Sequence, residues 1–230
     1  MKRIITVQHT QSVHHTNGMV GSWTDWELTE TGKQQAYNIA RNLRSELSDD
    51  GYIIYSSDLL RAKQTAEIIA QHFAITPIFK TELRERNLGR CCGKSVKWLK
   101  DNIECIEKHI DDKMFSDAES RRDVWNRLKP FFDSIISDES ENIIIVSHGD
   151  LLSVFNTMFL GLNPDFINNC EIFGFAGGVS QMYINDDKKR YIKRISDLSY
   201  MQKNSDCAPR RRADRLTGGN PVRKGLTNHR

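Results

Sequence analysis

The chain has 230 residues, of which 38% are hydrophobic and 27% are charged, and its formal net charge is +3. This length suffices for one large α/β domain or two small ones, and the composition is typical of a globular protein. The apolar runs fall far short of the roughly 20 residues of a membrane-spanning helix, and the N-terminus lacks the pattern of a signal peptide. The five cysteines show no zinc or disulfide spacing, which favours a cytoplasmic location without membrane contact.

The end of the chain differs in charge from the rest. Residues 201–230 contain eight Lys or Arg against two Asp, a local charge of +6, and few apolar residues. We therefore predict a folded domain over residues 1–200 and a disordered basic tail over residues 201–230. A basic tail can bind nucleic acid. Without aromatic residues or a folded motif, however, a solvated appendage or a segment added for expression is the preferred interpretation.

Strands and helices are predicted to alternate along most of the chain. The first strand, 4–7, precedes a polar loop over 10–28, and Thr29 is a suitable cap for the next helix, which ends before Asp49-Asp50-Gly51. Further strands are predicted at 52–55, 75–79, 142–146, 172–175, 179–184 and 190–195. Further helices are predicted at 58–72, 94–110, 118–137 and 150–160. This order predicts an α/β fold with a mainly parallel sheet that is covered on both faces.

Two of the predicted strands end in a histidine. Strand 4–7 leads to His9, and strand 142–146 leads to His148. Because the carboxyl ends of parallel strands share one edge of a sheet, we expect both histidines at that edge, where open α/β folds bind ligands. From the pattern alone, the pair could be a nucleophile and its partner, two metal ligands or an anion clamp.

Five stretches of the chain carry a recognisable pattern. They are Gln8-His9-Thr10-Gln11-Ser12, Ser22-Trp23-Thr24-Asp25-Trp26-Glu27-Leu28-Thr29-Glu30-Thr31-Gly32, Tyr55-Ser56-Ser57-Asp58-Leu59-Leu60-Arg61-Ala62-Lys63-Gln64-Thr65-Ala66, Leu83-Arg84-Glu85-Arg86-Asn87-Leu88-Gly89 and Val146-Ser147-His148-Gly149. In this order, they resemble the motifs of the histidine phosphatase superfamily, also called the phosphoglycerate mutase-like family. The resemblance runs from residue 4 to residue 198. It implies a three-layer α/β/α sandwich of the phosphoglycerate mutase-like kind.

The resemblance also implies a phosphatase site that needs no metal and no organic cofactor. His9 would be the nucleophile that forms a phosphohistidine, and Glu85 would be the general acid and base. Arg61 and His148 would bind the phosphoryl oxygens. The other residues expected to line the phosphate pocket are Gln8, Gln11 and His15.

Three positions depart from the family pattern. Gln8 stands where the family has an arginine, Thr10 where it has a glycine, and His15 where many members have an asparagine. The loss of one charge-assisted contact costs roughly 1.5–3 kcal/mol, or about one to two powers of ten in rate. Thr10 either narrows the space beside the nucleophile or adds its hydroxyl to the phosphate site. His14 and His15 could restore positive charge if a bound anion favoured their protonated forms. The alternative is that both are solvated loop histidines.

The sequence therefore predicts a phosphomonoester hydrolase that acts on a small phosphorylated substrate. The stretch Leu83-Arg84-Glu85-Arg86-Asn87-Leu88-Gly89 resembles the acid loop of the family. Mutases of the family carry a long insertion between this acid loop and the second histidine, whereas the interval here, 86–147, is short. Three alternatives stay open: a degenerate phosphatase that binds a phosphorylated ligand or protein without turnover, a phosphoglycerate-type mutase, and a zinc site. The zinc site would use His9, His14, His15 and His148. The sequence determines neither the substrate nor the oligomeric state, for which a dimer is one option.

Overall fold

The computed structural model describes residues 1–47 and 51–203. Its strands are β1 (Lys2–Gln8), β2 (Tyr52–Ser57), β3 (Ile78–Lys80), β4 (Asn142–Ser147), β5 (Val179–Ile184) and β6 (Arg190–Asp197). Its α-helices are α1 (Glu30–Glu46), α2 (Leu60–Phe73), α3 (Val96–Asn102), α4 (Arg121–Ser137) and α5 (Gly149–Phe159). Short 3-10 helices include η1 (Val13–His15) and η5 (Leu198–Met201).

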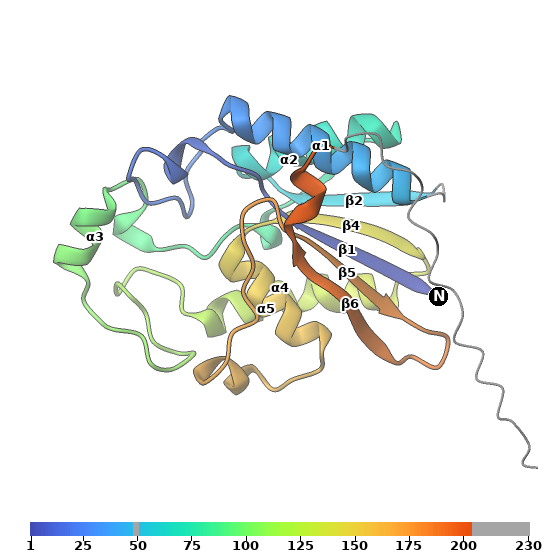
Figure 1. Ribbon diagram of the computed structural model, residues 1–230. Helices are drawn as coiled ribbons and strands as arrows, with labels where there is room; N and C mark the ends of the chain where they lie inside the picture. The colour runs from blue at the N-terminus through green and yellow to red at the C-terminus, as the bar shows by residue number, and fades with distance from the viewer. Residues whose placement is uncertain (48–50, 204–230) are drawn as a thin grey trace, which may run out of the picture.

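The strands described form one sheet in the order β3-β2-β4-β1-β5-β6 (Figure 1). Strands β1 to β4 run parallel, β5 runs antiparallel to β1, and β6 runs antiparallel to β5. Helices α1 and α2 cover one face and α4 and α5 the other, so the predicted three-layer sandwich is confirmed (Figure 1). Gln8 pairs with Ser147, and the N–H of His9 donates to the Ser147 carbonyl (2.9 Å). His9 and His148 therefore leave the sheet at the same edge, as predicted.

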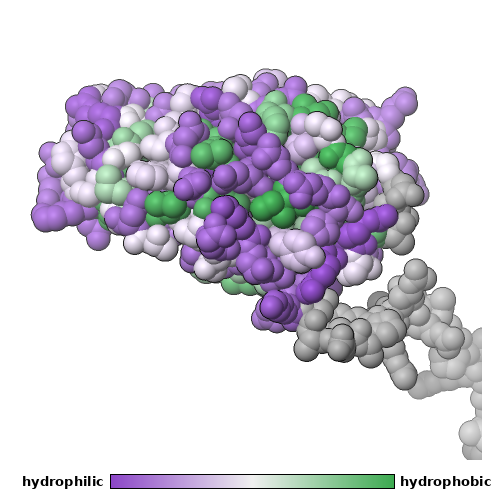
Figure 2. Space-filling model, turned by 90° about the horizontal axis from the view of Figure 1, so that it is seen from above, coloured by the Kyte–Doolittle hydropathy of each residue, from purple (hydrophilic) through white to green (hydrophobic). Residues whose placement is uncertain are grey.

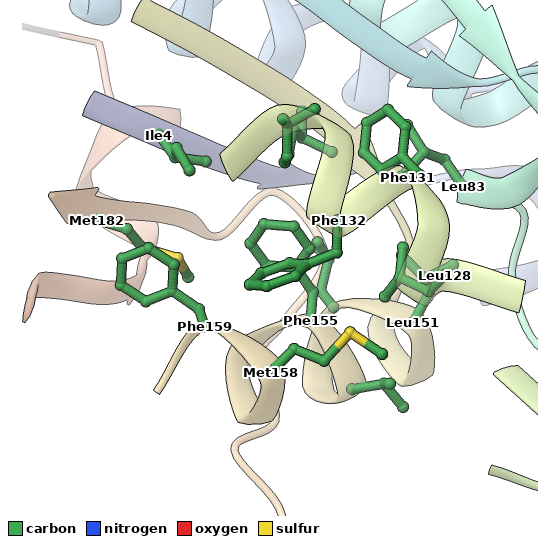
Figure 3. Packing of buried hydrophobic residues seen from close by; sticks show 14 of the residues in the cluster. Ile4, Leu83, Leu128, Phe131, Phe132, Leu151, Phe155, Met158, Phe159 and Met182 are labelled. Carbon is green, nitrogen blue, oxygen red and sulfur yellow. The ribbon is translucent and has the colours of Figure 1, made fainter. Parts of the chain in front are cut away.

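An apolar cluster between the sheet and the α4–α5 layer holds this edge in place (Figure 3). The rings of Phe132 and Phe155 meet edge to face with their centroids 5.4 Å apart. Ile4 of β1 and Met182 of β5 belong to the same cluster. Because Phe155 is fully buried, its replacement by alanine should cost about 3–5 kcal/mol. This packing fixes α5, and with it the turn that carries His148.

The face of the molecule seen from above is mainly hydrophilic. Polar residues there are interleaved with small apolar patches (Figure 2). Within residues 1–47 and 51–203, no helix combines the length and apolarity needed to cross a membrane. The cytoplasmic location stays a prediction.

The predicted helix 94–110 is wrong beyond Asn102, where α3 ends. The chain then forms a loop in which the N–H of Glu104 donates to the Met114 carbonyl (3.1 Å). The Asp112 carboxylate accepts two backbone N–H groups, from the residues three and four positions before it (2.8 and 2.7 Å). Such bonds between a short acidic side chain and the backbone compete with helical hydrogen bonds at the end of the predicted segment.

The predicted strand 172–175 is also wrong, because this segment is irregular. It leads into Gly177, which has a φ angle of +77°. The N–H of Gly177 lies 3.1 Å from the carbonyl oxygens of both Gln8 and His9. The segment therefore turns over the end of β1 and does not pair along a strand, and the positive φ angle favours glycine there.

The other predicted elements lie within three residues of the observed ones. The largest shifts, of three residues, affect the start of the helix predicted at 118–137 and that of the edge strand predicted at 75–79, which the structure places at Ile78–Lys80. Pro77 precedes it and has no N–H to give to the sheet. Asp49 and Asp50, predicted to break the first helix, lie outside the described residues.

The chain remains packed against α1 after the last strand. Tyr200 is buried. The side-chain amide of Asn38 donates to the Met201 carbonyl, and that of Asn42 to the Tyr200 carbonyl, both at 2.8 Å. From residue 204 onward, the predicted tail lies outside the described residues, so its disorder stays a prediction.

Candidate active site

His9 follows β1 directly, and only 3% of it is exposed. Its Nδ1 lies 2.8 Å from the Thr10 carbonyl, which can only accept, so Nδ1 carries a proton. The Nε–H of Arg61 donates to His9 Nε2 (3.2 Å). These bonds define a neutral ring with a lone pair on Nε2. Burial, followed by the charge of Arg61, holds the pKa of His9 well below its ordinary value. The ring is therefore a competent nucleophile at neutral pH.

Arg61 lies in the first turn of α2, as predicted, and is almost fully buried. Its guanidinium donates to the carbonyls of Thr24 and Ser22, both at 2.8 Å. Within the described part of the chain, no carboxylate forms an ion pair with it. Burial lowers the pKa of Arg61 to about 10, which leaves it charged at neutral pH. A buried cation whose hydrogen bonds go to neutral acceptors, and not to a carboxylate, is suited to bind an anion.

His148 is fully buried at the turn between β4 and α5. Its ring meets the ring of His9 edge-on, with centroids 5.1 Å apart. The Oγ of Ser57 lies 2.8 Å from His148 Nε2 and also accepts the N–H of Leu59 (3.2 Å). The Ser57 hydroxyl can donate its proton to Nε2, and in that tautomer the ring proton sits on Nδ1. Nδ1 has no hydrogen-bond partner among the described residues. A buried donor beside His9 suits an anionic oxygen.

Glu85 reaches the same turn from the acid loop. Its carboxylate accepts the backbone N–H groups of Arg86 (2.9 Å), Leu151 (3.2 Å) and Asp150 (3.4 Å). It therefore lies at the N-terminus of α5, beside the turn that carries His148. Burial, followed by the negative charge of Asp150, raises the pKa of Glu85 to about 7. A carboxyl group that titrates near neutral pH can serve as both acid and base.

Sequence reasoning missed the residues that hold the acid loop. Arg127 of α4 donates to the carbonyls of Glu82 (2.8 Å), Arg84 (3.1 Å) and Glu85 (3.2 Å). The indole N–H of Trp23 donates to the Glu85 carbonyl as well (2.6 Å). These partners are backbone atoms far away in the sequence, so no local pattern points to Arg127. Its position fixes the backbone from which the Glu85 side chain projects.

The rings of His14 and His15 lie against that of His9, and the predicted role of His15 in phosphate binding stays a prediction. The ring of His15 stacks on that of His9 with centroids 5.4 Å apart and planes 10° apart. The rings of His14 and His9 are 5.8 Å apart, and those of His14 and His15 are 4.1 Å apart. With the ring of His148 at 5.1 Å from that of His9, all four histidines of the zinc alternative thus lie together, and His9, His14 and His15 bring their nitrogens closest together.

One nitrogen from each of these three rings lies within 4.8 Å of the others, a separation that a metal ion could bridge. His9 Nε2, however, already accepts a hydrogen bond from the Arg61 guanidinium. A divalent cation on this nitrogen would face that buried positive charge. The charges therefore favour an anion over a metal ion at this site.

The predicted role of Gln8 in the phosphate pocket stays a prediction. A β-carbon on Gly149 would lie 3.4 Å from Gln8 Nε2, and one on Gly174 would lie 3.6 Å from Gln8 Oε1. The amide thus lies between the start of α5 and the irregular segment before β5. The Gln8 side chain makes no hydrogen bond to any of the residues described, so it is free of the Arg61 and His9 network.

Thr10 and Gln11 bind the start of α1. The Thr10 hydroxyl donates to the Gly32 carbonyl (2.8 Å) and therefore does not join the phosphate site. The side-chain oxygen of Gln11 accepts from the Thr29 hydroxyl (2.7 Å), and Thr29 in turn caps α1 by accepting the Gly32 N–H. A β-carbon at Gly32 would lie only 1.9 Å from the Gln11 carbonyl oxygen. The role of Gln11 in phosphate binding stays a prediction.

Residues 4–197 match the family model of the histidine phosphatase superfamily, branch 1. The chain belongs to this superfamily. A probable phosphoglycerate mutase of Erwinia tasmaniensis is 29% identical over 183 residues, which are 75% of this chain and 83% of that protein. A probable 2-carboxy-D-arabinitol-1-phosphatase of Arabidopsis thaliana is 28% identical over 174 residues, which are 73% of this chain and 35% of that protein.

The fold comparison agrees with the family. A mycobacterial glucosyl-3-phosphoglycerate phosphatase superposes with a TM-score of 0.72 at 20% identity, over 84% of this chain and 97% of that one. Relatives in the histidine phosphatase superfamily thus include both phosphatases and mutases by name, and an activity of this general kind fits the chain.

Proposed function

We propose that this histidine phosphatase superfamily member hydrolyses small phosphomonoesters through a phosphohistidine on His9. One observation carries the proposal. The neutral ring of His9 presents its Nε2 lone pair beside the buried guanidinium of Arg61, which has no carboxylate partner in the described part of the chain. A nucleophile and a cation without an ion-pair partner at one point suit attack on a phosphoryl group.

In the first step, the substrate's phosphoryl oxygen replaces His9 Nε2 as the acceptor of the Arg61 Nε–H. His9 Nε2 then attacks phosphorus, and the bond from phosphorus to the ester oxygen breaks. Protonated Glu85 gives its proton to the leaving oxygen, which departs as an alcohol. Arg61 and the Nδ1–H of His148 hold the phosphoryl oxygens while charge is redistributed among them. The product of this step is phosphohistidine at position 9.

In the second step, water attacks the phosphohistidine. The Glu85 carboxylate, now without its proton, accepts a proton from the water, and the bond between phosphorus and Nε2 breaks. Inorganic phosphate leaves, and His9 and Glu85 return to their initial protonation states. Neither step calls for a metal ion or an organic cofactor.

We favour hydrolysis over transfer to a second substrate group. A mutase must shield the phosphohistidine from water, and the family achieves this with a long insertion before the second histidine. Here the corresponding segment contains only α3 and a loop before α4 begins at Arg121. Because one relative is named a phosphoglycerate mutase, a coupled assay with phosphoglycerate should accompany the phosphatase assay. Mutase turnover faster than hydrolysis would overturn this preference.

The test compares wild type and His9→Ala on p-nitrophenyl phosphate and then on a panel of natural phosphomonoesters, without added metal. We expect loss of turnover in His9→Ala, and an acid-labile, alkali-stable label in wild type after exposure to a radiolabelled substrate. His72→Ala is the matched control, because His72 lies in the last turn of α2, at the opposite end from Arg61. Wild-type protein that binds vanadate but neither turns over nor takes up label would be a degenerate binding protein.

The zinc alternative can be tested by measuring the metal content of the protein. Protein purified without a nickel column should contain less than stoichiometric metal by inductively coupled plasma analysis, and its activity should survive a chelator. Stoichiometric zinc that is lost in His14→Ala would contradict the proposed anion site.

A further inference from the structure

One buried residue, Ser12, holds both His14 and His15. The Oγ of Ser12 lies 2.6 Å from His14 Nδ1, and the backbone N–H of Ser12 donates to His15 Nδ1 (3.2 Å). Because Nδ1 of His15 accepts this bond, the proton of the neutral ring must sit on Nε2. A second proton on His15 would turn both ring nitrogens into donors and break the bond to Ser12. The backbone thus favours the neutral ring.

The loop packs around this arrangement. A β-carbon at Gly21 would lie 2.8 Å from Cδ2 and Nε2 of His14, so only a glycine lets the ring lie there. His15 is exposed on its outer side and stacks on His9 on its inner side. One nitrogen of His15 and one of His9 lie within 4.8 Å of each other, close enough for one phosphoryl group to touch both rings.

The charged and titratable groups around the pair define the charge of the site. Three groups face the rings of His14 and His15: His9 just after β1, Arg61 of α2, and His148 in the turn before α5. Asp25, Glu85 and Cys92 act on the charge of Arg61 from the surrounding loops. No described carboxylate forms an ion pair with either imidazole. Burial, with the charge of Arg61, lowers the pKa of His15, and burial followed by His15 lowers that of His14 to about 3. Both rings are therefore neutral.

We propose that His15 serves the phosphoryl group as a neutral Nε2–H donor, and that the site consequently prefers a singly charged phosphoryl group. The proposal deepens the proposed function and rests on it. Arg61 is the one permanent cation among the described residues that contact His9, and the Gln8 amide adds no charge. A doubly charged phosphoryl group would leave an excess negative charge in a buried site, whereas a singly charged one matches the guanidinium.

The protonation state of His15 can be observed directly. In protein labelled with ¹⁵N-histidine, multiple-bond ¹H–¹⁵N spectra distinguish the two neutral tautomers from the cation, and His15→Asn identifies the His15 signals. We expect the Nε2–H tautomer both without ligand and with tungstate bound. A cationic pattern for His15 in the presence of tungstate would overturn the proposal. His72 is the internal reference, because it lies away from the site.

The charge preference can be measured with two inhibitors of similar shape. Phosphate gains a proton between about pH 8.5 and about pH 5.5, whereas sulfate stays doubly charged. We expect the inhibition constant of phosphate, relative to that of sulfate, to fall about tenfold or more over this range. Titration of Glu85 affects both inhibitors and cancels in the ratio. A ratio that does not change with pH would contradict a preference for single charge.

Two variants connect the residues to this preference. Gln8→Arg adds a second cation and should strengthen sulfate inhibition about tenfold. His15→Asn keeps a neutral donor and should retain most of kcat/KM, whereas His15→Phe keeps a ring without a donor and should raise KM about tenfold. Equal KM values for His15→Phe and wild type, in protein that still forms the His9 phosphohistidine, would overturn this inference alone. Absence of the phosphohistidine would overturn the proposed function, while the inhibitor and tautomer measurements would still test His15.

Discussion

The ends of β1 and β4 share one design and support different chemistry. Each is a buried strand that delivers a histidine to the same edge of the sheet. His9 has both ring nitrogens occupied, by the Thr10 carbonyl and by Arg61. His148 has one nitrogen bound to Ser57 and one without a partner in the described ranges. The strand positions each imidazole, and the hydrogen-bond partners of its ring nitrogens determine whether the nitrogen that faces the site is an acceptor or a donor.

The segments after the two histidines also differ. After His9, the chain enters a polar loop that returns two more imidazoles to the site. After His148, helix α5 begins, and its first N–H groups bind the Glu85 carboxylate. The β1 end thus concentrates neutral nitrogen atoms, whereas the β4 end links a donor to an acid. In the proposed mechanism, the β1 end would form the phosphohistidine and the β4 end would protonate the leaving group.

Apart from the loss of turnover expected in His9→Ala, the largest effect should come from the acid at the β4 end. Glu85→Gln should lower kcat by about 10²–10⁴ on an alkyl phosphate such as glycerol phosphate. The loss should be smaller on p-nitrophenyl phosphate, because p-nitrophenolate leaves without protonation. Initial rates on both substrates test this, with His72→Ala as the control. An equal loss on the two substrates would mean that Glu85 does not protonate the leaving group.

The same carboxyl group determines how activity depends on pH. The acid must be protonated, and its pKa is raised to about 7, so kcat should fall as pH rises through about 7. His9 stays neutral over this range because its pKa is lowered, and it therefore adds no ionisation there. A pH series should show this alkaline decline in wild type and lack it in Glu85→Gln. If kcat of Glu85→Gln still falls at alkaline pH, the decline is caused by the ionisation of another group.

The donor at the β4 end should matter less than the nucleophile at the β1 end. His148→Ala removes one donor to the phosphoryl group and should lower kcat by about 10²–10³. The phosphohistidine should nevertheless form, slowly, whereas His9→Ala should show none. Trapping of radiolabelled phosphate on both variants makes the distinction. Labelled protein in His9→Ala would show that the roles of the two strand ends are reversed.

The support of the acid loop should have a moderate effect. Arg127→Met removes the donors to three backbone carbonyls of this loop while it keeps a long apolar side chain. We expect kcat to fall about tenfold, since each lost hydrogen bond is worth about 0.5–1.5 kcal/mol and Glu85 is displaced. The pH at which kcat declines should also shift, because the surroundings of Glu85 change. Unchanged kcat with lower thermal stability would limit Arg127 to a role in folding.

The smallest effect is expected beside the nucleophile. Thr10→Gly restores the family residue and removes the hydroxyl bond to the Gly32 carbonyl. The free energy of unfolding should fall by about 1 kcal/mol, while kcat changes by less than about threefold. Denaturant titration and initial rates measure both quantities. A large gain in activity would show that Thr10 obstructs the substrate.

Local sequence patterns predict the parts of the fold that depend on neighbouring residues. The apolar runs before His9 and His148 define buried strands, and Thr29 caps α1 through a bond to the N–H three residues on. The family motifs also place Arg61 and Glu85, because their spacing from the strand and helix ends is short. These residues lie where the sequence predicts them.

Contacts between distant backbone segments leave no such pattern. The irregular segment at 172–175 is held by Gly177, whose N–H approaches the end of β1. Arg127 pairs with the Glu119 carboxylate and also binds three carbonyl groups. Because a carbonyl is present at every residue, nothing in the sequence identifies those three. The tautomer of His15 likewise depends on a backbone N–H, that of Ser12. A three-dimensional structure is required for each of these.

Gly32 has a consequence for how tolerance to mutation would be interpreted. No other residue fits there, because the added β-carbon would overlap the Gln11 carbonyl oxygen. Saturation mutagenesis should therefore find position 32 as intolerant of substitution as position 9, although Gly32 has no side chain that could touch a substrate. Ranking by intolerance alone would place it among the catalytic residues. Assays that separate the amount of folded protein from the turnover of each molecule would place it with the architecture.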